Sequence, residues 1–220
     1  MLSSPNAAVI LAGGQGRRLG GRDKPALVVD GRALLDRALE AVPGIPVVVV
    51  GPPRTLPAGV VSAAEDPPGG GPAAAVAAGF AALPELPADA IVAVLAADLP
   101  GIDASTLARL CAALLAGSGD PDSCDPDSGS GDTYSADTYS ADTYSADPGG
   151  AVLLDPSGHR QYLIGVWRRG RLAAAITRRP QWHDAPLRDL LAPIRVVEVP
   201  GSDREAADID TPADLRRWLT

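Results

Sequence analysis

Chemically versatile side chains are scarce in this chain of 220 residues. It has two histidines and two cysteines, and aromatic residues make up 4% of the chain. A structural zinc site normally needs four cysteine or histidine ligands, and Cys111 and Cys124 lack the spacing of such a site. The sequence therefore argues against a zinc or iron–sulfur centre, and it offers no convincing catalytic pair centred on histidine.

Long apolar runs are also absent. No stretch approaches the ~18 uninterrupted apolar residues that a membrane-spanning helix requires. The first six residues lack the basic start of a signal peptide, and the apolar run at residues 7–12 is shorter than the roughly 7 to 15 residues of a signal core. We expect this run to be a buried first strand of a cytoplasmic protein without a membrane partner.

Negative charge is concentrated in one segment. The net charge is −8, but residues 117–149 contain eight of the 27 acidic residues and no basic residue, which leaves 19 acidic against 19 basic residues elsewhere. The same segment repeats Asp-Thr-Tyr-Ser-Ala with a five-residue period that fits neither helix nor strand. We interpret residues 117–149 as a disordered insertion in a single domain of residues 1–220, and the balanced remainder does not favour nucleic-acid binding.

Lysine occurs only once, at Lys24, and all other basic residues are arginine. One interpretation is an arginine-rich composition in which one lysine persists by chance. The other is that this position needs a compact ammonium group in a crowded phosphate pocket, where a guanidinium cannot replace it.

Apolar runs alternate with helical stretches along most of the chain. Strands are predicted at residues 7–12, 47–50, 60–62, 91–97, 151–154, 162–167 and 196–199, and helices at residues 32–41, 72–83, 104–116, 171–176, 186–191 and 211–219. This alternation predicts an α/β fold, a single three-layer Rossmann-like domain whose mostly parallel sheet carries helices on both faces. Residues 150–167, with a turn at 155–158, favour a β-hairpin. Ligands of such sheets bind at the carboxyl ends of the strands.

A glycine-rich, basic loop follows the first predicted strand. Its glycines, Gly13, Gly14 and Gly16, allow the backbone N–H groups to approach phosphates, and Arg17 and Lys24 add positive charge. The spacing fits neither the phosphate loop of ATPases nor the dinucleotide fingerprint. A longer loop with several cations suits a nucleoside triphosphate, and a plain surface turn is the alternative.

Aspartates stand where two other segments reach the same sheet edge. Asp98 ends a buried strand, where an unpaired carboxylate is costly, and Mg²⁺ is its obvious partner. Asp208 and Asp210 lie on one side of an extended segment and could complete a metal site. The alternatives are helix capping by Asp98, for which Asp103 is better placed, and by Asp210.

Taken together, these motifs resemble the molybdenum cofactor guanylyltransferase family. They are Leu11-Ala12-Gly13-Gly14, Asp23-Lys24-Pro25, Glu65-Asp66 before Gly70-Gly71-Pro72, Ala97-Asp98-Leu99-Pro100 and Asp208-Ile209-Asp210-Thr211-Pro212. The resemblance implies transfer of GMP from GTP to molybdopterin, with pyrophosphate leaving. It implies nucleotide binding by Leu11, Ala12, Gly13, Gly14, Gly16, Lys24, Asp66 and Asp98, Mg²⁺ binding by Asp98, and contacts of Arg160 and Gln161 with the acceptor.

The chemistry requires no covalent intermediate. An acceptor phosphate oxygen attacks the α-phosphorus in line, with Arg17, Lys24 and Asp98 as the catalytic residues and Mg²⁺ on Asp98 and on Asp208 or Asp210. Two departures from the family keep other acceptors and CTP open: Val50-Gly51-Pro52-Pro53 stands where an asparagine often contacts the base, and Asp208-Ile209-Asp210 where Asn-x-Asn is frequent. The alternatives are a molybdopterin cytidylyltransferase, a phospholactate guanylyltransferase, a sugar-1-phosphate enzyme, a dehydrogenase or a non-catalytic nucleotide-binding module.

Overall fold

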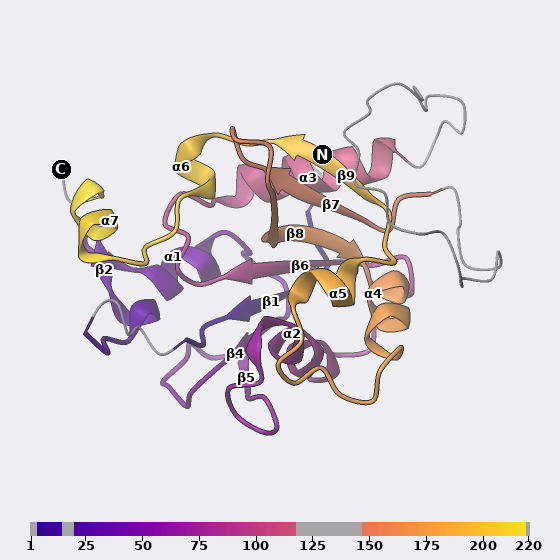
Figure 1. The fold of residues 1–220 in the computed structure, drawn as a ribbon, viewed down its shortest axis with the longest axis horizontal. Helices are drawn as coiled ribbons and strands as arrows, with labels where there is room; N and C mark the ends of the chain where they lie inside the picture. Colours follow the sequence, from indigo (N-terminus) through magenta and orange to yellow (C-terminus); the bar gives the residue numbers. More distant parts are fainter. Residues whose placement is uncertain (1–3, 15–19, 118–146, 219–220) are drawn as a thin grey trace.

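The computed structural model describes residues 4–14, 20–117 and 147–218. Its main sheet has seven strands in the order β5-β4-β1-β6-β8-β7-β9 (Figure 1). These strands are β1 (Ala7–Leu11), β4 (Val47–Val50), β5 (Val60–Ala63), β6 (Ile91–Ala96), β7 (Gly150–Leu154), β8 (Arg160–Arg168) and β9 (Val196–Pro200). Only β8 runs against its neighbours, β6 and β7, while the other pairs are parallel. The predicted mostly parallel sheet is confirmed.

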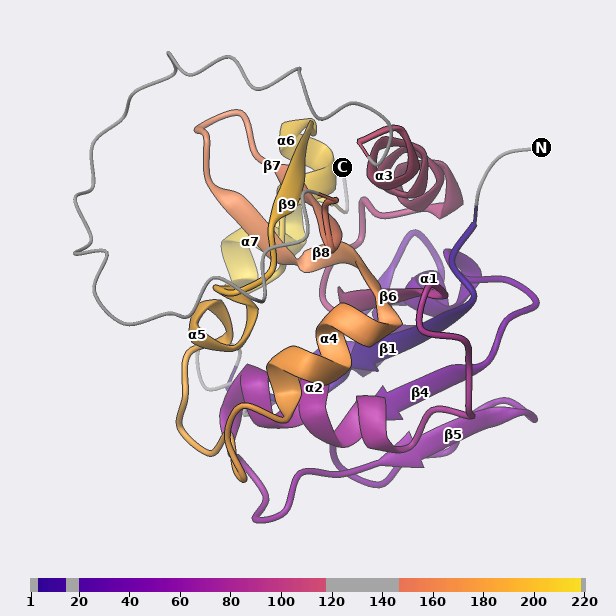
Figure 2. The same cartoon turned by 90° about the vertical axis from the view of Figure 1, so that its right-hand side faces the viewer.

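Helices cover both faces of the sheet because successive strand residues point to opposite sides. In β1, Ala8 and Ile10 pack in the same core as α1 (Leu34–Glu40) and α3 (Ala104–Ala116). Val9 between them packs against α2 (Gly71–Ala81) on the other face. The helices α4 (Arg169–Ile176) and α5 (Leu187–Leu191) share that second face (Figure 2). The three-layer architecture is therefore confirmed.

The predicted hairpin is present in the second half of the sheet. β7 and β8 pair antiparallel, and Asp155 shapes the turn between them. Its Oδ1 accepts hydrogen bonds from the backbone N–H groups of Ser157 and His159, both at 2.9 Å. This hairpin inserts the one reversed strand into the main sheet.

Two short elements near the N-terminal half differ from the sequence prediction. The helix expected over residues 32–41 begins only at Leu34, because β2 (Val28–Val29) and β3 (Arg32–Ala33) form a small hairpin before it. Asp30 and Gly31 turn this hairpin with positive φ angles of 50° and 77°. A 3-10 helix, η2 (Lys24–Ala26), precedes it.

The C-terminal segment crosses back from β9 to the N-terminal half of the chain. It forms α6 (Asp203–Ala206), which sequence periodicity did not reveal, and α7 (Pro212–Arg217), which is shorter than predicted. Among the described residues, no helix is long and apolar enough to span a membrane. Most of the predicted insertion at residues 117–149 lies outside the described residues, so its disorder remains a prediction.

Candidate active site

The carboxyl end of β6 positions the first acidic residue. Ala97 donates its backbone N–H to the carbonyl of Leu11 at 2.9 Å, which ties the end of β6 to the end of β1. Asp98 comes next and is half-buried, while Leu99 and Pro100 behind it are buried. The carboxylate of Asp98 therefore stands at the edge of the sheet, beside the start of the glycine loop.

Asp208 and Asp210 reach the same place from the other end of the chain. The intervening Ile209 donates its backbone N–H to the carbonyl of Asp98 at 3.1 Å. Its side chain is fully buried and packs with Val29 and Leu34. One carboxylate oxygen from each of the three aspartates lies within 4.8 Å of the other two. The structure thus brings together the three carboxylates that the sequence predicts as metal ligands.

Lys24 lies against this acidic cluster. Its Nζ donates a hydrogen bond to Asp210 Oδ1 and lies 3.4 Å from Asp98 Oδ2. The side chain of Lys24 is only 15% exposed. Burial works against the charged form, but the hydrogen bond to Asp210 and the charges of Asp98 and Asp210 together raise the pKa of Lys24 above its ordinary value. The ammonium group of Lys24 is therefore protonated and positively charged at the end of the glycine loop.

The electrostatics of the cluster favour a bound cation. Removal from water raises the pKa of Asp208, and the nearby charges of Asp210 and Asp98 raise it further, with Lys24 opposing the shift. Three carboxylates at this spacing repel one another, and hard oxygen ligands are those that Mg²⁺ prefers. The three carboxylates therefore fit a divalent cation of this type.

The glycine loop follows β1, and the structure describes its beginning, up to Gly14. Leu11 ends the strand, and Ala12 donates its N–H to the carbonyl of Val50 at 2.8 Å. Gly13 and Gly14 are exposed, and an added Cβ at either would meet no atom of the described residues within 4 Å. Gly14 has a φ of 116°, which requires glycine. Gly16 and Arg17, both predicted to bind nucleotide or its phosphates, lie outside the described residues.

Arg54 supports this loop, although no sequence motif singles it out. Its Nη2 donates to the carbonyl of Ala12 at 2.9 Å, and its guanidinium lies 3.4 Å from both carboxylate oxygens of Asp23. The residue therefore joins the beginning of the loop to its end. The only available signal was its position in the segment after β4, at the same sheet edge.

The segment between β5 and α2 contains the predicted nucleoside-binding residue. Asp66 is exposed there, at the carboxyl end of β5. Its neighbour Glu65 accepts hydrogen bonds from the N–H groups of Gly69 at 2.6 Å and Gly70 at 3.0 Å. Glu65 thus has a local role in shaping the turn, while the prediction for Asp66 stays a prediction.

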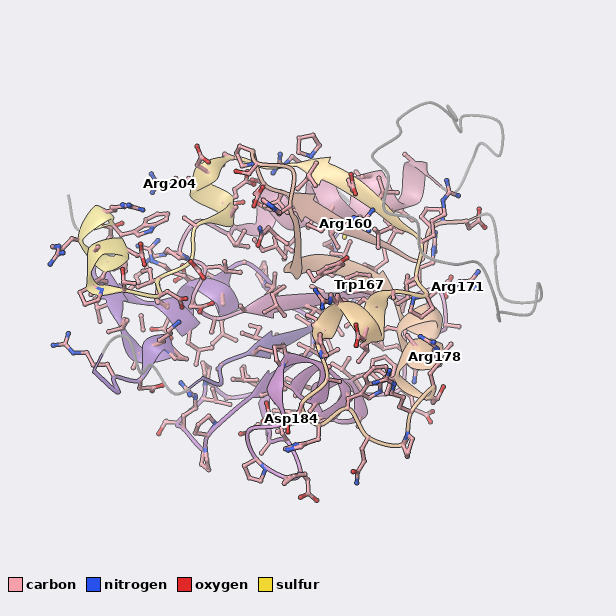
Figure 3. All side chains as sticks on the ribbon, in the orientation of Figure 1. Arg160, Trp167, Arg171, Arg178, Asp184 and Arg204 are labelled. Carbon is pink, nitrogen blue, oxygen red and sulfur yellow. The ribbon has the colours of Figure 1, made fainter. Side chains whose placement is uncertain are left out.

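The two hairpin residues predicted to contact the acceptor have partners within the sheet. Arg160 donates from Nε to Glu198 on β9 at 2.6 Å, and Gln161 donates to Asp155 at 2.8 Å. Figure 3 labels Arg160 on this hairpin. Both contacts hold the hairpin in shape, so either side chain would have to exchange a partner in order to bind a ligand.

The capping alternatives are resolved by the structure. Asp103 accepts hydrogen bonds from the N–H groups of Ser105 and Thr106 and is the N-cap of α3. Thr211, rather than Asp210, is the N-cap of α7 and forms a capping box with Asp214. Asp98 and Asp210 are therefore available for the acidic cluster.

Comparisons with known proteins agree with this geometry. The family model described as "MobA-like NTP transferase domain" matches residues 8–199. A curated protein named molybdenum cofactor guanylyltransferase, from Acidiphilium cryptum (strain JF-5), is 62% identical over 37 residues. That stretch is 17% of this chain and only 19% of the curated protein.

Solved structures share the fold at low sequence identity. The chain is similar to molybdopterin-guanine dinucleotide biosynthesis protein A from Archaeoglobus fulgidus, with 18% identity, coverage of 97% and 96% of the two chains and a TM-score of 0.64. It is also similar to 2-C-methyl-D-erythritol 4-phosphate cytidylyltransferase from Thermus thermophilus, with 19% identity, coverage of 98% and 97% and a TM-score of 0.61. These two likenesses establish the fold.

Proposed function

The chain belongs to the family of MobA-like NTP transferase domains and is a nucleotidyltransferase; we propose that it transfers GMP from GTP to molybdopterin, in a Mg²⁺-dependent reaction that releases pyrophosphate. The observation that carries this proposal is the contact of Lys24 with Asp98 and Asp210 in a cluster of three aspartates, beside the start of the glycine loop. This arrangement supplies a cation for phosphate oxygens and oxygen ligands for a metal at one sheet edge. The proposal includes a cytoplasmic location.

Each residue has a definite task in this reaction. The backbone N–H groups of Gly13 and Gly14 bind the triphosphate, and Arg17 and Lys24 stabilise the charge that develops on the departing pyrophosphate. Asp98, Asp208 and Asp210 hold the Mg²⁺. When bound, this ion supplies positive charge where negative charge grows on the transferring phosphoryl group. The acceptor is a phosphate monoester that is already largely ionised at pH 7, so no side chain has to act as a general base.

CTP is a second candidate for the nucleotide substrate. The short curated match to a guanylyltransferase supports GTP. Against this, the segment Val50-Gly51-Pro52-Pro53 stands where the family often has a base-contacting asparagine. A Cβ at Gly51 would lie 2.7 Å from the carbonyl oxygen of Ala12, so the backbone leaves no room for a side chain there. A base near this segment would have to be recognised by other groups, so CTP stays open as the alternative nucleotide.

The decisive experiment is a pyrophosphate-release assay with GTP and CTP in separate reactions. Each contains Mg²⁺, with molybdopterin, its molybdenum-loaded form or no acceptor. Release with GTP that depends on molybdopterin is the expected result. Release with CTP alone would replace the nucleotide in the proposal, and the absence of release with both nucleotides would reject the proposed reaction.

A further inference from the structure

We propose that Glu205 is a positioning residue for the metal site, because it fixes the segment that contains Asp208 and Asp210 against the segment that contains Asp98. This inference rests on the proposed function, since the value of the arrangement lies in the cation that the three carboxylates hold. Glu205 itself touches none of these three carboxylates in any contact of the described residues. Its effect is transmitted through the backbone of the C-terminal segment.

The C-terminal segment needs such a support. It leaves β9, which β8 and β7 separate from β6, the strand that precedes Asp98. Residues 201–210, which we call the C-terminal arm, contain no strand of the sheet. The arm therefore lacks the ladder of backbone hydrogen bonds that fixes β6 just before Asp98, although two carboxylates of the arm must lie beside that of Asp98.

Glu205 joins the arm to the first turns of α3. Its Oε1 accepts hydrogen bonds from Thr106 Oγ1 at 2.6 Å and from Arg109 Nη2. Its Oε2 accepts from the backbone N–H of Ser202 at 2.9 Å and from the Ser202 hydroxyl at 3.0 Å. Thr106 is buried, and the Glu205 side chain is 16% exposed. One carboxylate thus closes the capping box of α6 and holds α6 against α3.

The surrounding backbone is packed closely enough for this contact to set the position of the arm. A Cβ at Gly101 would lie 1.9 Å from the carbonyl oxygen of Arg204, so only glycine allows α6 this close. Arg109 also donates to the carbonyl of Pro200, at 3.3 Å. Also on α6, the guanidinium of Arg204 lies 4.8 Å from the centroid of the Trp218 ring; Figure 3 labels Arg204 on α6.

The sequence positions explain why this contact bears on the carboxylates. In the arm, a short extended stretch separates Glu205 from Asp208. In the other segment, a turn and the first residues of α3 separate Asp98 from Thr106. The hydrogen bond from Ile209 N–H to the Asp98 carbonyl joins the two segments at the carboxylates themselves. Mutual repulsion of the three carboxylates favours their separation, and Glu205 opposes this by holding the two segments together.

The experiment compares Glu205→Ala and Thr106→Val with wild type and with two controls. Thr106→Ser keeps the hydroxyl that donates to Glu205. Glu40→Ala removes an exposed glutamate of α1 that pairs with Arg32 of β3, so the change lies outside the sequences of α3 and α6. The first readout is hydrogen exchange of the Ile209 amide, and the second is Mn²⁺ affinity of the nucleotide-free protein, measured by electron paramagnetic resonance. The third is the Mg²⁺ concentration that half-activates pyrophosphate release, set beside the nucleotide KM.

We expect faster exchange at Ile209 and weaker Mn²⁺ binding in Glu205→Ala, by roughly tenfold, the lower end of what residues supporting metal ligands contribute. The Mg²⁺ needed for half-activation rises in parallel, and saturating Mg²⁺ restores most of kcat. Thr106→Val shows the same changes to a smaller extent, and Thr106→Ser and Glu40→Ala behave as wild type.

The outcomes separate the two proposals. Unchanged exchange at Ile209, or faster exchange with unchanged Mn²⁺ affinity, overturns the positioning role of Glu205 even if its removal lowers Tm. A wild type that binds no Mn²⁺ overturns it as well, together with the metal site. If Mn²⁺ binding weakens as expected but no nucleotide is turned over with molybdopterin, the positioning role stands and the proposed reaction is wrong.

Discussion

The two sides of the candidate site are built in opposite ways. The side that we propose for the nucleotide phosphates, from Leu11 to Lys24, is one continuous segment that begins at the end of the central strand β1. The acidic side combines Asp98 at the end of β6 with a C-terminal arm that has no strand of its own. A phosphate loop needs only local backbone geometry, whereas a cluster of carboxylates needs distant segments held together against their own repulsion.

Lys24 connects these two sides. Its ammonium group belongs to the nucleotide segment, yet it contacts Asp98, 74 residues away, and Asp210, 186 residues away. The same cation can therefore serve phosphate oxygens on one side and carboxylates on the other. The most direct way to test the comparison is to remove one group from each side.

The largest effect is expected for Lys24→Ala and Asp98→Ala. Each should lower the rate of pyrophosphate release by a factor of about 10² or more, the usual scale for losing one electrostatic stabiliser. Lys24→Arg tests whether the single lysine persists by chance or is needed as a compact ammonium group. We expect it to stay impaired, because a planar guanidinium does not fit the position of a compact ammonium group between Asp98 and Asp210. Near-normal rates in the alanine variants would contradict the assigned roles.

A smaller effect, on stability, should distinguish the glycines of the two sides. Gly101→Ala places a Cβ against the backbone of Arg204 and should lower the free energy of unfolding by roughly 1–3 kcal/mol, as overpacking usually does. Gly13→Ala meets open space and should leave the free energy of unfolding unchanged. Urea unfolding of both variants measures the difference. Equal losses in the two variants would mean that the arm is no more closely packed than the glycine loop.

The third prediction concerns pH and the arm alone. Burial raises the pKa of Glu205, but the hydrogen bonds from Thr106 and Ser202 and the charge of Arg109 together lower it below its ordinary value. A carboxyl group whose pKa is lowered by folding contributes stability above its unfolded pKa and loses this contribution as the pH falls through the folded pKa. The free energy of unfolding of wild type should therefore exceed that of Glu205→Ala by its full amount at pH 7.

That difference should shrink as the pH falls below the ordinary glutamate pKa of about 4.3. Urea unfolding of both proteins at a series of pH values down to 3 provides the measurement. A difference that is constant over this range would show that Glu205 acts through packing and not through its charge. Glu40→Ala, which removes an exposed surface ion pair, serves as the control.

The smallest effect is expected at Cys111, in the middle of α3. Burial raises the pKa of its thiol to about 11, so the reactive thiolate is scarce at pH 8. In a Cys124→Ser background, labelling of Cys111 by a thiol reagent should be negligible in native protein and complete in urea. Adding Glu205→Ala to this background should leave the labelling of Cys111 slow, because the contact of Glu205 with Thr106 and Arg109 fixes the arm and does not hold the core of α3 in place. Rapid labelling in that variant would show that the arm stabilises the whole helix.

Local sequence patterns account for most of the fold. The seven strands of the main sheet and α3 lie where their apolar runs and helical spacing predict them. The predictions failed where a few residues turn sharply. The β2–β3 hairpin depends on the positive φ angles of Asp30 and Gly31, and α6 is a single turn whose capping residue Glu205 also contacts α3. Such short elements leave no periodicity to detect.

The sequence by itself determined which residue types meet in the site. A glycine loop after a strand, a lysine and three aspartates at the ends of extended segments were enough to indicate phosphate and metal chemistry, because these patterns are local. Tertiary structure alone decided how they are held: Arg54 joins the beginning of the glycine loop to its end, and Glu205 holds the arm against α3. The physical reason is that both roles depend on distances between atoms of residues that lie far apart in the chain.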